Sequence, residues 1–145
     1  MEQMKISLAS DHGGFLLKER IAEYLKAAGH EIFDCGTLST DSCNYPVFAK
    51  KAAALVRDGV CERGIVVCTT GEGVMMTANK IKGIRCGLVY NAEVAALIRA
   101  HNDANMMALG AKYVLPDDAV NWVEVFLSTP FEGGRHKLRV EMIEE

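Results

Sequence analysis

The fold is decided by residues 65–80, which read IVVCTTGEGVMMTANK. The stretch begins as a short apolar run rich in β-branched residues, which is typical of a buried strand. It ends as a run compatible with a helix, and a turn containing Gly71 and Gly73 joins the two parts. A strand, a glycine turn and a helix start place backbone N–H groups at the positive end of a helix dipole. The stretch therefore predicts an anion-binding loop with the Cys68 thiol at its edge.

The chain on either side repeats the order of strand, loop and helix. Strand candidates lie at residues 5–10, 31–35, 84–89 and 105–109, and helix candidates at residues 15–28, 46–58, 92–100, 119–128 and 135–144. Apolar residues recur at helical spacing, so we expect one face of each helix to be buried. In the first helix this face carries Leu17, Ile21, Leu25 and Ala28, and in the second it carries Val47, Ala52, Leu55 and Val56. We expect Asp117 or Asp118 to cap the helix at residues 119–128.

Strands that alternate with helices form parallel βαβ units with right-handed crossovers. We therefore predict an α/β fold, a doubly wound, five-stranded parallel sheet with helices on both faces. The length of 145 residues indicates one domain, residues 1–145. A break at residues 130–134 predicts that a C-terminal helical arm begins there, covering residues 131–145.

Charge and composition exclude several classes of protein. The net charge is −3 and no block of Lys and Arg dominates, so we expect neither a nucleic-acid partner nor a membrane surface. The five cysteines are odd in number and form no C-x-x-C pair, which indicates a reducing compartment. The four histidines lack the spacing of a zinc site, so we expect no metal. With no signal-peptide pattern before the first strand, we expect a cytoplasmic protein.

The predicted sheet determines which polar residues share a site. In an open α/β sheet, ligands bind beyond the carboxyl ends of the strands. That rule brings together residues 11–12, 35–45, 68–73 and Asn91. Cys68 at the start of the glycine loop is a candidate base or nucleophile, because a thiol near a helix N-terminus is activated. The alternative is a buried structural cysteine, since free cysteines are among the most buried residues.

The remaining candidates each have a structural alternative. Asp11 and His12 place an acid and an imidazole on the first loop, where they could take part in the chemistry. The alternative is that Asp11 is the N-cap of the helix and that the His12 ring faces solvent. His101 ends a helix, where the dipole alone favours histidine. Arg135 and Arg139, one turn apart, suit a phosphate or form a solvated face. Together these residue types fit proton transfer on a small phosphorylated molecule.

Ordered motifs along nearly the whole chain carry a family resemblance. They are residues 10–15 (SDHGGF), 34–37 (DCGT), 44–46 (NYP), 68–73 (CTTGEG), 78–80 (ANK), 83–85 (GIR), 101–105 (HNDAN) and 132–136 (EGGRH) with Arg139. In these motifs the chain resembles the ribose-5-phosphate isomerase B family, which also includes galactose-6-phosphate isomerase subunits. The resemblance implies a Rossmann-like, cofactor-free aldose–ketose isomerase. It further implies a homodimer with active sites at the subunit interface, and leaves open whether dimers pair into a tetramer.

The resemblance also implies a role for each matched residue. Cys68 is the implied base that moves a proton between C1 and C2 through an enediol(ate), with Thr70 and Asp11 handling the protons on O1 and O2. The developing oxyanion is bound by the N–H groups of Gly71, Glu72, Gly73 and Val74. His101 helps to open the furanose ring and Asn102 holds the substrate. The phosphate is bound by His12, Arg135 and Arg139, and Tyr45 lines the sugar pocket.

Three residues depart from the family pattern. Many relatives have Gly in place of Thr69 and a small or apolar residue in place of Glu72. Lys112 stands where an Arg often binds the phosphate, and lysine offers a point charge in place of a bidentate fork. Thr69 and Glu72 could each narrow or polarise the sugar pocket. On the matched set of Cys68, Thr70, Asp11 and His101 we expect ribose 5-phosphate and ribulose 5-phosphate as substrates. The alternatives are a hexose 6-phosphate substrate, such as allose or galactose 6-phosphate, and a non-catalytic sugar-phosphate-binding subunit.

Overall fold

The computed structural model describes residues 2–145. Strands and helices alternate along this range: β1 (Lys5–Ser10), α1 (Phe15–Ala27), β2 (Glu31–Asp34), α2 (Tyr45–Arg57), β3 (Arg63–Cys68), α3 (Glu72–Asn79), β4 (Cys86–Leu88), α4 (Ala92–Ala100), β5 (Met106–Gly110), a short 3-10 turn (Ala111–Tyr113), α5 (Pro116–Ser128) and α6 (Arg135–Ile143). Within residues 2–145, no helix has the length and apolar character needed to cross a membrane.

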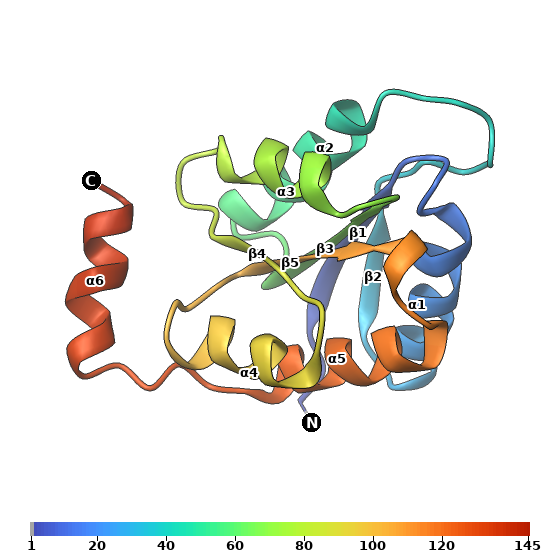
Figure 1. Cartoon of the computed structure of the whole chain (residues 1–145). Coiled ribbons are helices and arrows are strands. Elements are labelled where there is room, and N and C mark those ends of the chain that lie inside the picture. The colour runs from blue at the N-terminus through green and yellow to red at the C-terminus, as the bar shows by residue number, and fades with distance from the viewer. Residues whose placement is uncertain (1) are drawn as a thin grey trace.

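The five strands form one parallel sheet in the order β2-β1-β3-β5-β4. The chain leaves β1 toward one edge of the sheet and leaves β3 toward the other. The adjacent ends of β1 and β3 are therefore the switch point at which such sheets bind ligands. Figure 1 shows α2 and α3 on one face of the sheet and α1, α4 and α5 on the other. The predicted fold class is confirmed.

The core lies in two layers, one on each face of the sheet. Ile65 and Val67 of β3 pack toward α1 and α5, whereas Val66 and Cys68 pack toward α2 and α3. Both sets are buried because helices cover both faces, so β3 reads as a continuous apolar run. This packing fixes the end of β3 in the centre of the molecule. It also fixes the loop that follows, residues 68–73, which we call the thiol loop.

The C-terminal helix α6 stands apart from both layers (Figure 1). Only His136 and Val140 of this helix are buried. Its far end is tied to the body by Glu144, which accepts hydrogen bonds from Gly83 N at 3.0 Å and from Arg85 Nη1 at 2.9 Å. The arm predicted from the break before residue 135 is therefore present as a helix attached at its two ends.

Several local predictions are wrong. Ala28 and Val47 are exposed, because α1 ends at Ala27 and because the buried stripe of α2 runs through Ala49, Ala52, Ala53 and Val56. Helix α5 begins at Pro116, so Asp117 and Asp118 lie in its first turn and do not cap it. Strand β4 is only three residues long, since Ile84 N donates to Ile81 O in a turn.

Candidate active site

The thiol loop joins β3 to α3 at the carboxyl edge of the sheet. Gly71, with a φ of +80°, turns the chain so that α3 begins directly after it. Its N–H donates a hydrogen bond to the Cys68 Sγ at 3.2 Å, and Glu72 N donates to Thr70 Oγ1 at 3.2 Å. The sulfur of the buried Cys68 is thus oriented by the N–H of Gly71, the N-cap residue of α3. Thr70 and Glu72 are exposed at the same edge.

Asp11 lies on the neighbouring strand end. Its N–H donates to Val67 O at 3.2 Å, which ties the end of β1 to the end of β3. The buried Asp11 carboxylate accepts a hydrogen bond from Gly14 N at 3.1 Å, at the start of α1. A side chain at position 13 would collide with Thr69, so the two loops are in contact. The N-cap of α1 is Gly14, so Asp11 is not the cap that the structural alternative expected. Its carboxylate instead holds the turn before α1, on the loop next to Cys68.

The loop after β2 closes over this edge. Cys43 N donates a hydrogen bond to His12 Nδ1 at 3.3 Å, which joins this loop to the loop after β1. A side chain at Gly73 would collide with the Tyr45 ring, which places that ring against the thiol loop. Lys112 N donates to Thr69 O at 3.1 Å, and its side chain is exposed. These three predicted binding residues border the same loop.

The other predicted residues lie at the opposite side of the sheet, beside the amino-terminal ends of the strands. Helix α4 runs back along the sheet, so His101 and Asn102 follow its end, just before β5 begins. The paired strands separate the two edges, since Met106 pairs with Gly64 and Gly110 with Cys68. Four residues of strand span about 13 Å. Within one chain, His101 and Asn102 therefore do not meet Cys68.

The arginines of α6 belong to this second group. Arg135 and Arg139 are exposed on successive turns of α6. Neither guanidinium has a carboxylate within ion-pair distance among residues 2–145. A cavity of about 550 Å³ lies between α6 and the body and is lined in part by Asn102. The predicted site is therefore split into a thiol half at the carboxyl edge and a cationic half beside α6.

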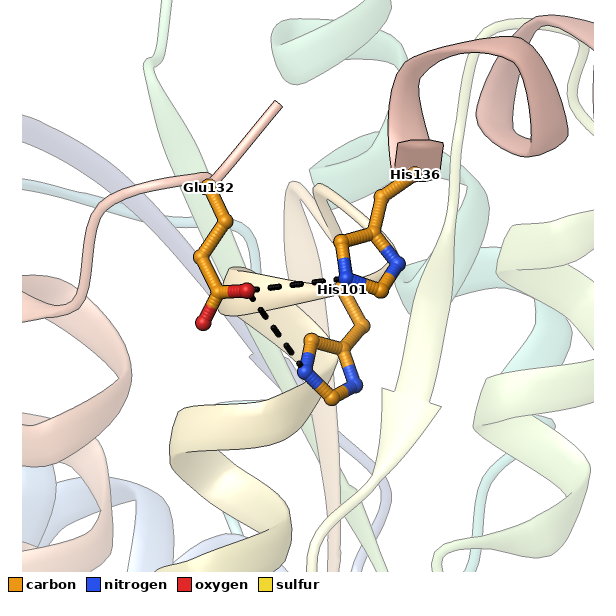
Figure 2. A group of neighbouring side chains, drawn as sticks. All are labelled: His101, Glu132 and His136. Carbon is orange, nitrogen blue, oxygen red and sulfur yellow. Dashed lines mark ion pairs between the residues drawn. The ribbon is translucent and has the colours of Figure 1, made fainter. Parts of the chain in front are cut away.

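His101 stacks on a second histidine, to which the sequence had assigned no role. The rings of His101 and His136 are nearly parallel, at 13°, with centroids 4.3 Å apart. Both Nε2 atoms face one oxygen of Glu132, at 3.8 Å from His101 and 3.5 Å from His136 (Figure 2). Burial lowers the pKa of His136, and the positive charges of His101 and Arg135 lower it further. Only the i, i+4 spacing of Glu132 and His136 pointed to this cluster.

Two imidazoles and a carboxylate are ligand types that suit a transition metal. A metal ion needs the lone pairs of its ligands to converge on one point. The stacked rings hold their Nε2 lone pairs in two separate, nearly parallel planes, so the two lone pairs do not meet at one point. The arrangement of His101, Glu132 and His136 therefore fits a shared proton better than a shared ion.

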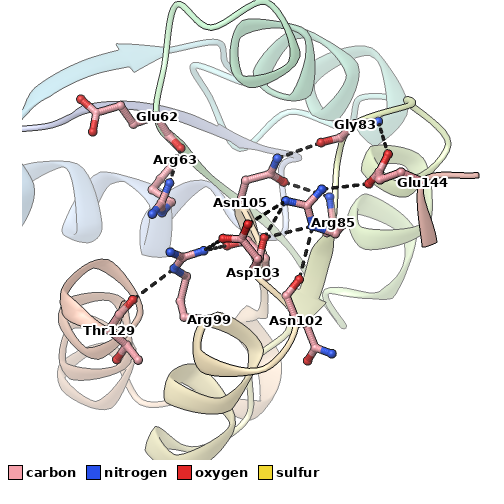
Figure 3. A network of polar contacts seen from close by, with 11 residues as sticks. Glu62, Arg63, Gly83, Arg85, Arg99, Asn102, Asp103, Asn105, Thr129 and Glu144 are labelled. Atoms are coloured by element: carbon pink, nitrogen blue, oxygen red, sulfur yellow. Dashed lines mark hydrogen bonds and ion pairs between the residues drawn. The ribbon is translucent and has the colours of Figure 1, made fainter. Parts of the chain in front are cut away.

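A network of arginines holds the turn that carries His101 and Asn102 (Figure 3). Asp103 has a φ of +47°, which is strained for a residue with a side chain. Arg85 Nη2 donates to Asp103 O at 2.8 Å, and Arg99 Nη1 donates to Asp103 Oδ1 at 2.7 Å. Because Arg85 also binds Glu144, the same network joins the turn to the end of α6.

Comparison with known proteins assigns the family. A family model described as Ribose/Galactose Isomerase matches residues 6–143. The chain belongs to the ribose/galactose isomerase family. A putative sugar phosphate isomerase of Rickettsia bellii is 41% identical over 144 residues, which are 99% of this chain and 100% of that one. Ribose-5-phosphate isomerase B of Escherichia coli is 40% identical, over 96% of this chain and 93% of its own.

Solved structures of the ribose/galactose isomerase family have the same fold. Ribose-5-phosphate isomerase B of Clostridium thermocellum matches with a TM-score of 0.96 at 47% identity, over 97% of this chain and 95% of that one. The enzyme of Mycoplasma genitalium, solved with bound ribulose-5-phosphate, matches with a TM-score of 0.93 at 39% identity, over 97% and 93% of the two chains. The predicted family is confirmed, whereas the roles of the individual site residues stay predictions.

Proposed function

We propose that this protein interconverts ribose 5-phosphate and ribulose 5-phosphate without a cofactor. Support comes from the relatives named ribose-5-phosphate isomerase B, which match almost the whole chain. The observation that carries the proposal is the hydrogen bond of 3.2 Å from Gly71 N to Cys68 Sγ, in a loop that also adjoins Asp11. A thiol oriented at the N-terminus of a helix is suited to remove a proton from carbon beside a carbonyl.

In the proposed mechanism, the Cys68 thiolate removes the proton from C2 of the open-chain aldose. The electron pair of that C–H bond forms the C1–C2 double bond of an enediolate. The negative charge develops on O1, where the N–H groups of residues 71–74 stabilise it. Thr70 and Asp11 exchange the protons on O1 and O2, and the Cys68 thiol returns its proton to C1 to give the ketose.

We further propose that a second copy of the chain completes each site. His101, Asn102, Arg135 and Arg139 carry ring opening, substrate binding and phosphate binding in this mechanism, yet they lie at the other edge of the sheet from Cys68. A two-fold dimer can bring the cationic half of one copy to the thiol half of the other. The exposed apolar residues of α6, Leu138 at 64%, Met142 at 56% and Ile143 at 59%, support such a contact.

We also propose a cytoplasmic location. All five cysteines are free thiols, as a reducing compartment would maintain them.

Turnover of a panel of aldose phosphates by the purified protein tests the function. We expect the highest kcat/KM with ribose 5-phosphate, and lower values with allose 6-phosphate and galactose 6-phosphate. The Cys68→Ala variant is expected to lose solvent deuterium incorporation at C2 of the substrate. Wild-type exchange in that variant would refute the assignment of Cys68 as the base. Binding of sugar phosphates without turnover of any of them would favour the non-catalytic alternative.

A further inference from the structure

Three separate segments bring His101, Glu132 and His136 together. His101 follows the last turn of α4, and His136 lies in the first turn of α6. Glu132 lies in the connection from α5 to α6, where its N–H donates to Ala100 O at 3.0 Å. The backbone of Glu132 is therefore fixed against the same turn that carries His101. The carboxylate is held beside both rings, as Figure 2 shows.

The geometry of the cluster fits one proton shared among three groups. The distances of 3.8 and 3.5 Å from the two Nε2 atoms to Glu132 Oε1 are too long for a direct hydrogen bond. They still permit attraction between a carboxylate and a protonated ring. Two protonated rings with centroids 4.3 Å apart would repel each other. One carboxylate therefore balances the charge of one imidazolium.

The surroundings of the two rings determine where that proton resides. The His136 side chain is 9% exposed, whereas that of His101 is 38% exposed. Burial lowers the pKa of His136, and the charges of His101, Arg135 and Arg139 act in the same direction against the opposing effect of Glu132. His136 thus remains a neutral ring against which His101 stacks, and the exposed His101 is the member that can meet a ligand.

We propose that Glu132 and His136 are positioning residues for His101: the carboxylate keeps a proton on His101, and the stacked His136 ring fixes the plane of its imidazole. The proposal rests on the proposed isomerase function, in which His101 helps to open the furanose ring. In that step the C1–O4 bond breaks and its electron pair stays on O4, which takes the proton from His101. The C1 hydroxyl gives up its proton to water as the carbonyl forms.

The test separates ring opening from the proton transfer at carbon. Ribulose 5-phosphate is an open-chain ketose, because its C5 oxygen carries the phosphate. Exchange of its C1 hydrogen in deuterated water therefore reports enediolate formation without any ring step. For Glu132→Gln we expect isomerisation of ribose 5-phosphate to fall on the order of tenfold or more. Exchange at C1 of ribulose 5-phosphate is expected to remain near the wild-type rate.

The control is Glu141→Gln, which removes an exposed carboxylate from the same helix as His136. Both reactions should keep wild-type rates in this variant. Equal loss of isomerisation and exchange in Glu132→Gln would indicate a merely structural effect and overturn the proposal. Unchanged isomerisation would overturn it as well. Absence of turnover in the wild-type protein would instead refute the proposed function.

NMR of the imidazole rings in the free protein gives a second readout that needs no activity. We expect Glu132→Gln to change the His101 ring signals at pH 7, because the carboxylate that faces its Nε2 at 3.8 Å is gone. The ring signals of His12 and His30, which lie outside the cluster, serve as internal references. Unchanged His101 ring signals in Glu132→Gln would contradict the proposal, whatever the kinetic result.

Discussion

The buried ion pair between Lys18 and Asp34 permits a prediction with an unequal outcome for its two partners. The Lys18 side chain is fully buried, and its Nζ donates to both Asp34 oxygens at 2.7 Å. The Asp34 side chain is 30% exposed, and its Oδ1 also accepts from Gly36 N at 2.9 Å. Loss of the carboxylate charge therefore strands a buried ammonium group, whereas loss of the ammonium leaves a carboxylate that water and an N–H still solvate.

The magnitudes follow from this difference in burial. Removal of one partner of a buried pair costs about 3–5 kcal/mol of stability. We expect about 3 kcal/mol for Asp34→Asn, at the lower end because Glu19 remains 3.4 Å from Lys18 Nζ. For Lys18→Met we expect about 1 kcal/mol, because an apolar chain of similar length fills the buried space. The double variant should cost about as much as Lys18→Met alone, since no stranded ammonium remains.

Urea unfolding at pH 7 measures these costs. All variants are compared at one protein concentration, because the stability of the proposed dimer would depend on concentration. Unchanged m-values would confirm that the shifts in midpoint report stability. The reasoning is refuted if Lys18→Met costs as much as Asp34→Asn, or if the costs of the two single variants add in the double variant.

Three further predictions concern the loop, the thiols and acid stability. Gly73→Ala should displace the Tyr45 ring, so we expect steady-state kinetics to show a higher KM for the sugar phosphate. An unchanged KM would count against a role of Tyr45 in binding the sugar. Burial raises the pKa of Cys61 to about 11 and also raises that of Cys86, so both should resist thiol labelling of the native protein at pH 8; rapid labelling of either would contradict this. Burial lowers the pKa of His30, so the unfolded state binds its proton more readily and stability should fall as the pH drops below about 6.5. Urea midpoints at pH 7 and 5.5 should differ less in His30→Gln than in wild type.

The fold could be predicted from the sequence where local patterns agree with tertiary burial. The strand at residues 5–10 and the helix at residues 92–100 have the predicted bounds. The predictions that failed depended on information that is not local. Val47 is apolar, yet α2 buries a stripe that excludes it. Strand β4 was predicted too long, because the side-chain pattern of residues 84–89 does not show that the first of them belong to a turn.

The candidate site was predictable as a set of residues but not as an arrangement. The rule for parallel sheets correctly grouped Asp11, His12 and the thiol loop at one edge. It also included Asn91, whose side chain instead accepts from Val94 N to cap α4. The pairing of Glu132 with His101 depends on how the end of α4 meets the start of α6, which no sequence spacing encodes.

Complementation between two inactive variants tests most directly whether two copies build each active site. Cys68→Ala lacks the thiol half and His101→Asn lacks a residue of the cationic half, so each variant alone should have little activity. When equal amounts are dissociated and reassociated, random pairing gives mixed dimers as half of the population, each with one intact site. The account predicts recovery of about one quarter of the wild-type activity. A mixture that forms mixed dimers and stays as inactive as its parents would contradict it.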